Sequence, residues 1–439
     1  MFVKGSVSDG PFLFGGRDRS TSLRSWSGRR LSLNRVDQAT SQHGQTEWRG
    51  GLTRSEVSAA VIGFFCVAIL GFDNGGYFEP SWRWAILAFV AVTALALVLR
   101  SEVAFGRVEL VFLGALAALA GWTLLSSAWG IASTEAAREA ERVLVYVAGA
   151  AALLAVLERT AVRALLTGAM TGTVAVAAAG LGDRLFASPK ELDPRDGAPL
   201  VEPLGYANAL GILVAIGLVI AIGLLLGERR RYVIGLIVAA VIVLAVTLAL
   251  TASRGAWLAL GCGLIALLVL QPRQKPRRLG RRWLAIGAAT FVAGSMLATL
   301  AFKPGIGVRS AYWRAAMSDA RAHPLIGSGA GSFDDYWNRH RTVDVGVQDA
   351  HSLYLETLAE LGLVGFVLLV GVLVPPLVVI GATRSDPDVA IAAAGYVAFL
   401  VHAGLDWDWE MPATTLTGLA SAAALLVAAR PSSPGRVRC

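Results

Sequence analysis

The sequence predicts an all-α, polytopic membrane protein with about twelve transmembrane helices and a large outer loop between the ninth and tenth helices. Of its 439 residues, 55% are hydrophobic and only 16% are charged, and the mean hydropathy is +0.60. A soluble domain normally carries about 25% charged residues. Many apolar runs extend for about 17–20 residues, enough for a helix to cross a hydrocarbon core about 30 Å thick. The runs are continuous rather than alternating, which favours helices over a membrane β-barrel.

The apolar runs give the expected positions of the spans. They are predicted near 55–72, 84–99, 108–127, 143–158, 163–181, 207–226, 232–251, 255–270, 283–302, 353–381, 388–404 and 411–429. The run 353–381 is longer than one crossing needs, so its first turns are expected outside the bilayer. Pro375 and Pro376 are expected to kink its inner end. The segment 128–142 mixes Glu and Arg and is interpreted as an amphipathic helix on the outer interface.

Loop charges predict the orientation. With twelve spans, the basic N-terminal tail and the four most basic loops or ends fall on one side, which is therefore cytoplasmic; these segments are 100–107, 229–231, 273–282 and 430–438. The protein is expected in the cytoplasmic membrane with both termini in the cytoplasm. The outer side receives 73–76, 182–206, 302–352 and 406–410.

The same features divide the chain into three parts. Residues 1–54 are expected to be a disordered, basic cytoplasmic tail, because they hold few large apolar residues and no signal-peptide core. Residues 55–430 form the predicted membrane domain, whose outer loop is 302–352, and 431–439 form a cytoplasmic tail. The net charge of +8 is explained by this loop bias, so a bilayer is expected as partner and nucleic acid is not.

Several kinds of chemistry have no motif in the sequence. The Gly-rich stretch 327–331 lacks the Lys of a phosphate-binding loop, and no nucleophile elbow occurs. The three cysteines and the His, Asp and Glu residues show no metal-ligand spacing. Asp406, Asp408 and Glu410 could hold a cation, but the two intervening tryptophans favour an interfacial aromatic belt. No cofactor and no metal are therefore expected.

Three residues near the outer face are the main candidates for chemistry. Arg254 lies in a break between two apolar runs, where it is either a snorkelling side chain or a clamp for phosphate oxygens. Arg309 is expected to begin a helix, with Trp313 on the same face. His351 precedes the tenth span and could take a proton near neutral pH, although a single His at a helix start is more often ordinary.

Five further residues are weaker candidates for substrate contacts. Arg184 and Asn208 belong to the outer segment 182–208, which can equally be a solvated loop with an Asn helix cap. Trp313, Tyr354 and Glu356 flank the main candidates, and Glu356 is the alternative base to His351.

Three segments resemble the O-antigen ligase and polymerase family of membrane glycosyltransferases. They are the Ser-Arg-Gly turn at 253–255, the Arg309/Trp313 pair followed by His-Pro-Leu-Ile-Gly-Ser-Gly at 323–329, and His351 with Tyr354 and the Glu-Leu-Gly of 360–362. The likeness covers roughly 200–405. Ser352 departs from the family, which usually has Asn after this His.

The resemblance implies a reaction. Such proteins move a glycan from an undecaprenyl-pyrophosphate carrier to an acceptor hydroxyl on the outer leaflet, as ligases or polymerases in cell-surface polysaccharide assembly. Arg254 and Arg309 would then bind the pyrophosphate and His351 would be the catalytic base of an inverting, metal-independent displacement. The sugar, the acceptor and the choice between ligase and polymerase stay open. Two other classes also stay open: a transporter of a small anion such as bicarbonate, and a non-catalytic scaffold of a glycan-export complex.

The topology can be tested with reporter fusions. We expect fusions after Lys275 and after Val345 to report opposite sides of the membrane, because an odd number of spans separates the two positions. Reporters found on the same side would contradict the twelve-span topology and would separate His351 from an outer-leaflet donor.

Overall fold

The computed structural model describes residues 53–100, 105–186, 199–272, 305–341, 343–383 and 385–430, with side chains from 308 onward in the fourth range. The predicted ninth span, the predicted C-terminal tail and all but the last two residues of the predicted N-terminal tail lie outside these ranges.

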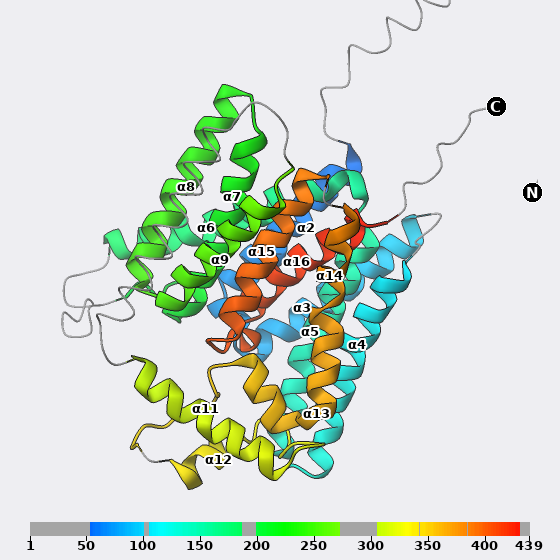
Figure 1. Cartoon of the computed structure of the whole chain (residues 1–439). Helices are drawn as coiled ribbons and strands as arrows, with labels where there is room; N and C mark the ends of the chain where they lie inside the picture. Colours follow the sequence, from blue (N-terminus) through cyan, green and yellow to red (C-terminus); the bar gives the residue numbers. More distant parts are fainter. Residues whose placement is uncertain are drawn as a thin grey trace, which may run out of the picture. The chain divides into compact units, whose positions relative to one another are not determined.

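Every regular element in the described ranges is helical (Figure 1). In chain order they are α2 (Arg54–Gly71), η1 (Asn74–Gly76), α3 (Glu79–Leu99), α4 (Arg107–Leu125), η2 (Ser126–Ala128), α5 (Ser133–Val156), η3 (Arg159–Ala161), α6 (Val162–Phe186), α7 (Ala207–Gly227), α8 (Arg231–Thr251), α9 (Arg254–Leu270), α11 (Gly305–Ala322), α12 (Phe333–His340), α13 (Leu353–Leu373), α14 (Pro375–Val378), η5 (Val379–Thr383), α15 (Pro387–Ala403), η6 (Asp408–Glu410) and α16 (Pro412–Ala428). The predicted all-α fold is confirmed for this part of the chain.

Seven of the described helical segments are long and apolar enough to cross a membrane. They include α2, α3, α4, α6, α7, α8 and the segment Leu353–Thr383. Three shorter apolar helices, α9, α15 and α16, have 17 residues each, which is the lower end of the usual spanning length of about 17–25 residues. These helices lie at the predicted spans and support a multi-pass membrane protein, while the count of twelve stays a prediction.

The start of α5 differs from expectation. The segment 128–142 was expected to lie on the interface as a separate amphipathic helix, but α5 runs without a break from Ser133 to Val156. Its charges pair within the helix and with a neighbour: Arg142 bonds Glu139 at 2.7 Å, and Arg138 bonds Glu79 of α3 at 2.6 Å. Because pairs three residues apart stabilise a helix, the charged turns continue into the apolar ones.

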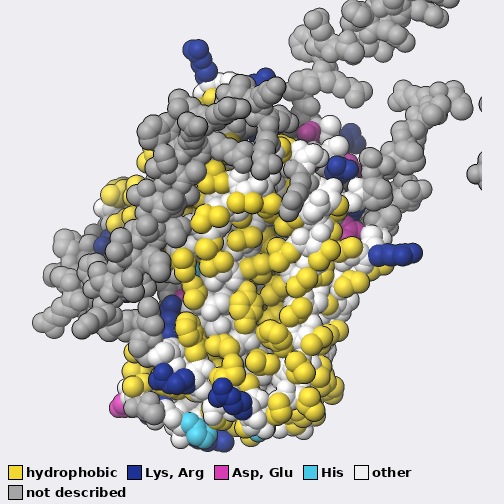
Figure 2. Space-filling model, in the orientation of Figure 1, with side chains coloured by type: hydrophobic (Ala, Val, Ile, Leu, Met, Phe, Trp, Pro, Cys, Tyr) yellow, Lys and Arg dark blue, Asp and Glu magenta, His cyan; other side chains and the backbone are white. Residues whose placement is uncertain are grey.

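The bundle buries its C-terminal helix and leaves apolar side chains outside. Every residue of α16 is buried, and α16 packs on α2, α5, α6, α7 and α15. On the outer faces, by contrast, Trp84, Val98, Leu236 and Val269 are 74%, 80%, 68% and 73% exposed. Figure 2 shows hydrophobic side chains across the middle of one face, with Lys, Arg and His toward its ends. A surface of this kind is suited to lipid.

Small residues allow a very close contact between α2 and α6. A Cβ atom on Gly168 would lie 2.0 Å from the backbone oxygen of Ala60, so only glycine permits this approach. Close backbone packing of this sort is a main source of helix association in membranes.

The long helix α13 is broken at Gly362. Its φ of 65° and ψ of −165° are not helical and are accessible to glycine. The strap, residues 324–329, supplies partners for the interrupted backbone. Leu363 and Val364 donate to the Pro324 and Leu325 carbonyls at 2.9 and 3.2 Å.

The strap also serves the carbonyl groups on the other side of the break. Ser328 and Gly329 donate their backbone N–H groups to the carbonyls of Ala359 and Glu360 at 3.1 and 2.8 Å. The indole of Trp122 donates to the Leu361 carbonyl at 3.0 Å. A broken helix persists at a membrane only where its backbone is satisfied in this way.

The segment before α13 forms two helices with a small core of their own. Tyr312 and Ala316 of α11 pack with Phe333 and Trp337 of α12 and with Ala350. Both helices contact α13, and Figure 1 shows them at one end of the helical bundle, beside the start of α13. The predicted outer loop is therefore a folded, mainly helical unit where the structure describes it.

The break in α13 gives a stability prediction. Gly362→Ala should lower the free energy of unfolding by about 1–3 kcal/mol, because the positive φ is strained for alanine and its Cβ would lie 2.4 Å from the backbone of Leu325. Gly114→Ala is the matched control, since a Cβ there meets nothing within 4 Å. Unfolding of both variants in the same detergent checks this, and equal stabilities would contradict it.

Candidate active site

A buried carboxylate, that of Asp406, joins distant parts of the chain. It lies between α15 and η6 and is 1% exposed. Its Oδ2 accepts hydrogen bonds from Arg309 Nη2 at 2.9 Å and Asn208 Nδ2 at 2.6 Å. Its Oδ1 accepts from the Tyr206 hydroxyl at 3.0 Å and from the backbone N–H of Trp407 at 3.1 Å. A buried charge is tolerated when it is paired and hydrogen-bonded, and Asp406 meets both conditions.

His351 lies beside this carboxylate. Its Nε2 is 4.0 Å from Asp406 Oδ1, and its ring is 5.3 Å from that of Tyr312. Its Nδ1 lies 3.0 Å from the Asp349 carbonyl oxygen. Because a carbonyl only accepts, Nδ1 is the donor, and the neutral imidazole therefore carries its lone pair on Nε2. The backbone of His351 has a φ of 54°, an uncommon conformation that recurs at functional sites.

The charge state of His351 follows from its surroundings. Burial lowers its pKa below the usual 6.5, and the Asp406 carboxylate opposes this effect only in part. The pKa is lowered on balance, so the ring is neutral at neutral pH and able to accept a proton.

Backbone contacts hold the segment that carries His351. Trp313 donates its indole N–H to the His351 carbonyl at 3.3 Å, and Glu356 accepts the Ala350 N–H at 2.7 Å. The Tyr354 hydroxyl donates to the Leu400 carbonyl on α15 at 2.6 Å. These bonds position the loop and α13, whereas the predicted contacts of Trp313, Tyr354 and Glu356 with substrate remain predictions.

The three predicted arginines have different surroundings. Arg309 lies within α11, four residues after its start rather than at its start as expected, and reaches Asp406. Arg254 is the exposed first residue of α9 and follows a tight turn in which Ala252 is left-handed. Arg184 lies in the last turn of α6, and the described structure shows no contact between it and Asp406. Convergence of Arg254 and Arg309 on one ligand remains a prediction.

Sequence reasoning did not predict the hydrogen bond of Tyr206 to Asp406, nor the central place of Asp406 itself, and it misread other residues nearby. Asn208 was expected as a possible helix cap, but Tyr206 holds the cap position of α7 and Asn208 turns to the carboxylate. The tryptophans of 406–410 were assigned to an interfacial belt, yet Trp409 is only 6% exposed and packs on the Tyr146 ring at 4.7 Å. The alternation of acidic residues and Trp at 406–410 could have indicated a site rather than an interfacial belt, because an aromatic belt needs no carboxylates.

A second group of acidic side chains, two half-buried and one buried, lies near His351 in the chain and includes Asp349. One oxygen from each of Asp349, Glu356 and Glu410 lies within 4.8 Å of the others, a grouping that sequence spacing did not indicate. Arg142 approaches Glu410 at 3.8 Å and bonds Glu139. Burial raises the pKa of both Asp349 and Glu410, and the neighbouring negative charges raise it further.

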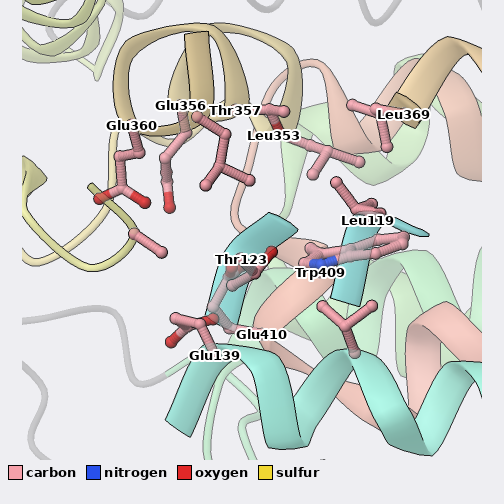
Figure 3. Close-up of a pocket in the computed structure, with 13 residues that line it drawn as sticks. Leu119, Thr123, Glu139, Leu353, Glu356, Thr357, Glu360, Leu369, Trp409 and Glu410 are labelled. Atoms are coloured by element: carbon pink, nitrogen blue, oxygen red, sulfur yellow. The ribbon is translucent and has the colours of Figure 1, made fainter. Parts of the chain in front are cut away.

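Glu356 and Glu410 also border a partly open cavity with an empty volume of about 450 Å³. Figure 3 shows Glu356 and Glu360 extending from α13 toward the side where Glu139 and Glu410 lie. Glu360 accepts the N–H groups of Gly331 and Phe333, both at 2.9 Å, and so fixes the start of α12.

A larger pocket opens beside His351. Its empty volume is about 880 Å³, and its wall includes Tyr77, Tyr206 and Trp407. A proton acceptor, a cation held on a carboxylate and an open pocket are thus neighbours, which is what a group-transfer site requires.

The comparison with protein families agrees with this arrangement. Residues 239–370 match the family model described as O-antigen ligase. The match confirms the predicted resemblance and supports an O-antigen ligase-like enzyme that processes glycans at a membrane. It contains Arg254, Arg309 and His351, whereas Asn208 and Asp406 lie outside the matched residues. No curated protein matches the chain.

The role of Asp406 can be tested separately from activity. Asp406→Asn places an amide N–H₂ among side chains that donate, so one or more buried donors lose a partner. We expect the free energy of unfolding to fall by about 1–3 kcal/mol for each lost partner. Asp344→Asn is the control, because the Asp344 side chain is 98% exposed. Denaturation of both variants in detergent should separate them, and matching curves would argue against a structural role for Asp406.

Proposed function

We propose that the protein transfers a glycan from an undecaprenyl-pyrophosphate carrier to an acceptor hydroxyl at the outer face of the cytoplasmic membrane. The observation that carries the proposal is the meeting of Arg309 and His351 at the Asp406 carboxylate, with both residues inside the O-antigen ligase match. A cation suited to phosphate and a base suited to a hydroxyl are thereby brought to one place.

In the proposed reaction, the acceptor oxygen attacks the anomeric carbon of the donor sugar. A new glycosidic C–O bond forms while the bond from the anomeric carbon to the pyrophosphate oxygen breaks, with inversion at that carbon. His351 Nε2 takes the hydroxyl proton, and Asp406, 4.0 Å away, stabilises the resulting imidazolium.

The leaving pyrophosphate carries the negative charge of the broken bond. Arg309 and Arg254 are the proposed partners for this charge, because a guanidinium binds two phosphate oxygens in one plane. Asp406 holds Arg309 in place before substrate arrives, so the cation is already oriented when charge develops. In this proposal, Asn208 and Tyr206 act through Asp406 as positioning residues.

The proposal predicts the effect of removing the base. His351→Gln should slow transfer about 10²–10⁴-fold, the usual contribution of a general base, while donor binding persists. Because the pKa of His351 is lowered, wild-type activity should persist below the ordinary imidazole pKa of about 6.5 and fall only at more acidic pH, as the ring becomes protonated. The measurement is release of undecaprenyl pyrophosphate from lipid-linked glycan, as a function of pH.

A substitution on α11 provides the companion test. Arg309→Lys keeps the charge but loses the planar fork, so transfer should fall, whereas Arg321→Lys in the last turn of the same helix should leave it unchanged. Wild-type rates in both His351→Gln and Arg309→Lys would rule out the proposed mechanism. Movement of a small anion across vesicles, without any glycan transfer, would instead favour a transporter.

A further inference from the structure

The pocket beside His351 is built from parts of the chain that are far apart in sequence. Tyr77 follows η1, Tyr206 precedes α7, and Trp407 follows Asp406. The other wall comes from Asp334 and Asn338 of α12 and from the segment 346–349. The pocket therefore exists only when the helical bundle and α12 are both in place.

Three aromatic rings form one wall. Tyr206 stacks on Trp407 with ring centroids 4.4 Å apart and an interplanar angle of 23°, and Tyr77 meets Trp407 edge-on at 5.8 Å. The hydroxyl of Tyr206 is fixed by Asp406, and that of Tyr77 donates to Gln348 at 3.2 Å. The rings are half-buried, so they are held rigidly and still present apolar surface to the pocket.

The opposite wall is polar where the structure describes it. Asn338 and Gln348 offer amide donors and acceptors, and Asp334 and Asp349 offer carboxylate oxygens. Among the described residues that line the pocket there is no Lys or Arg. An aromatic wall facing amides and carboxyl groups suits a ring with apolar C–H faces and a rim of hydroxyls, whereas a carboxylate such as that of Asp334 would repel a phosphate.

We propose that this pocket is the subsite for an uncharged pyranose of the acceptor glycan. The assignment rests on the proposed function, because it takes His351 as the base. The pocket is lined by His351 but by neither Arg254 nor Arg309, the proposed partners of the donor pyrophosphate. The sugar in it is thus the one whose hydroxyl meets the base. The aromatic wall packs on its ring face, and Asn338 and Gln348 bond its remaining hydroxyls.

The proposal is tested by sugar binding to the full chain in detergent. The probes are methyl glycosides of neutral hexopyranoses and the same glycosides bearing a 6-phosphate, with binding followed by saturation-transfer NMR. We expect at least one neutral glycoside to bind and its 6-phosphate to bind more weakly. Trp407→Ala should weaken the neutral glycoside about tenfold, in line with about 1.4 kcal/mol for one aromatic contact.

Matched variants separate recognition from folding. Trp84→Ala removes a tryptophan that is 74% exposed on α3 and should leave sugar binding unchanged. Asn338→Ala alters an exposed side chain of α12, so the fold should survive while affinity falls. Asp334→Asn should narrow the difference in affinity between the neutral sugar and its 6-phosphate, because it removes a carboxylate charge from the pocket wall.

The possible results distinguish this proposal from the proposed function. The subsite assignment would be overturned if no neutral glycoside bound, or if neither Trp407→Ala nor Asn338→Ala changed the affinity. The proposed glycan transfer would be unaffected by either result. Tighter binding of the 6-phosphate would also overturn it. In the transfer assay, Asn338→Ala should raise the acceptor KM with little change in kcat, whereas His351→Gln should lower kcat. Wild-type kcat in His351→Gln would overturn the assignment of His351 as the base, and the acceptor subsite built on it, whereas absence of transfer by the wild-type protein would overturn the proposed function.

Discussion

The burial of one negative charge organises the end of the helical bundle where α11 begins. Asp406 is removed from water, so its carboxylate must be satisfied by protein donors, and it draws these from the start of α7, from α11 and from its own loop. Removal of any one donor leaves the others facing an underpaired charge. The same carboxylate orients Arg309 and lies beside His351. Structural and proposed chemical requirements therefore converge on a single side chain.

A second constraint connects the outer helices to the membrane part. The Gly-rich segment 327–331 has the composition of a phosphate-binding loop, yet its described backbone N–H groups are used within the protein. Ser328 and Gly329 bond the end of the outer half of α13, and Gly331 bonds the Glu360 carboxylate. The glycines in this segment, which lies within the family match, thus allow close approach to neighbouring backbone, which at Gly327 is that of α13. They attach α11 and α12 to the helix that follows His351.

Composition and apolar run length were enough to predict the helices. A segment that crosses lipid needs about twenty mostly apolar residues and must satisfy its own backbone hydrogen bonds. Charged turns were harder: α5 was divided in error, since pairing of Arg142 and Arg138 with partners across the helix surface cannot be read from composition. His351 and Arg309 could be picked out from the sequence because this chain has few ionisable residues. Asp406, at the centre of the site, could not. The side chains that donate to Asp406 lie 97 to 200 residues away in the sequence, and only the folded chain brings them together.

The break at Gly362 divides α13 mechanically as well as geometrically. In a continuous helix, axial hydrogen bonds transmit any reorientation of one end to the other. Here the last carbonyls before the break and the first N–H groups after it bond the strap at 324–329 instead of each other. Bilayers of different thickness impose different tilts on the helices that cross them. We therefore expect such tilting to be taken up at the break, which would let the segment carrying His351 keep its position while lipid composition changes around it.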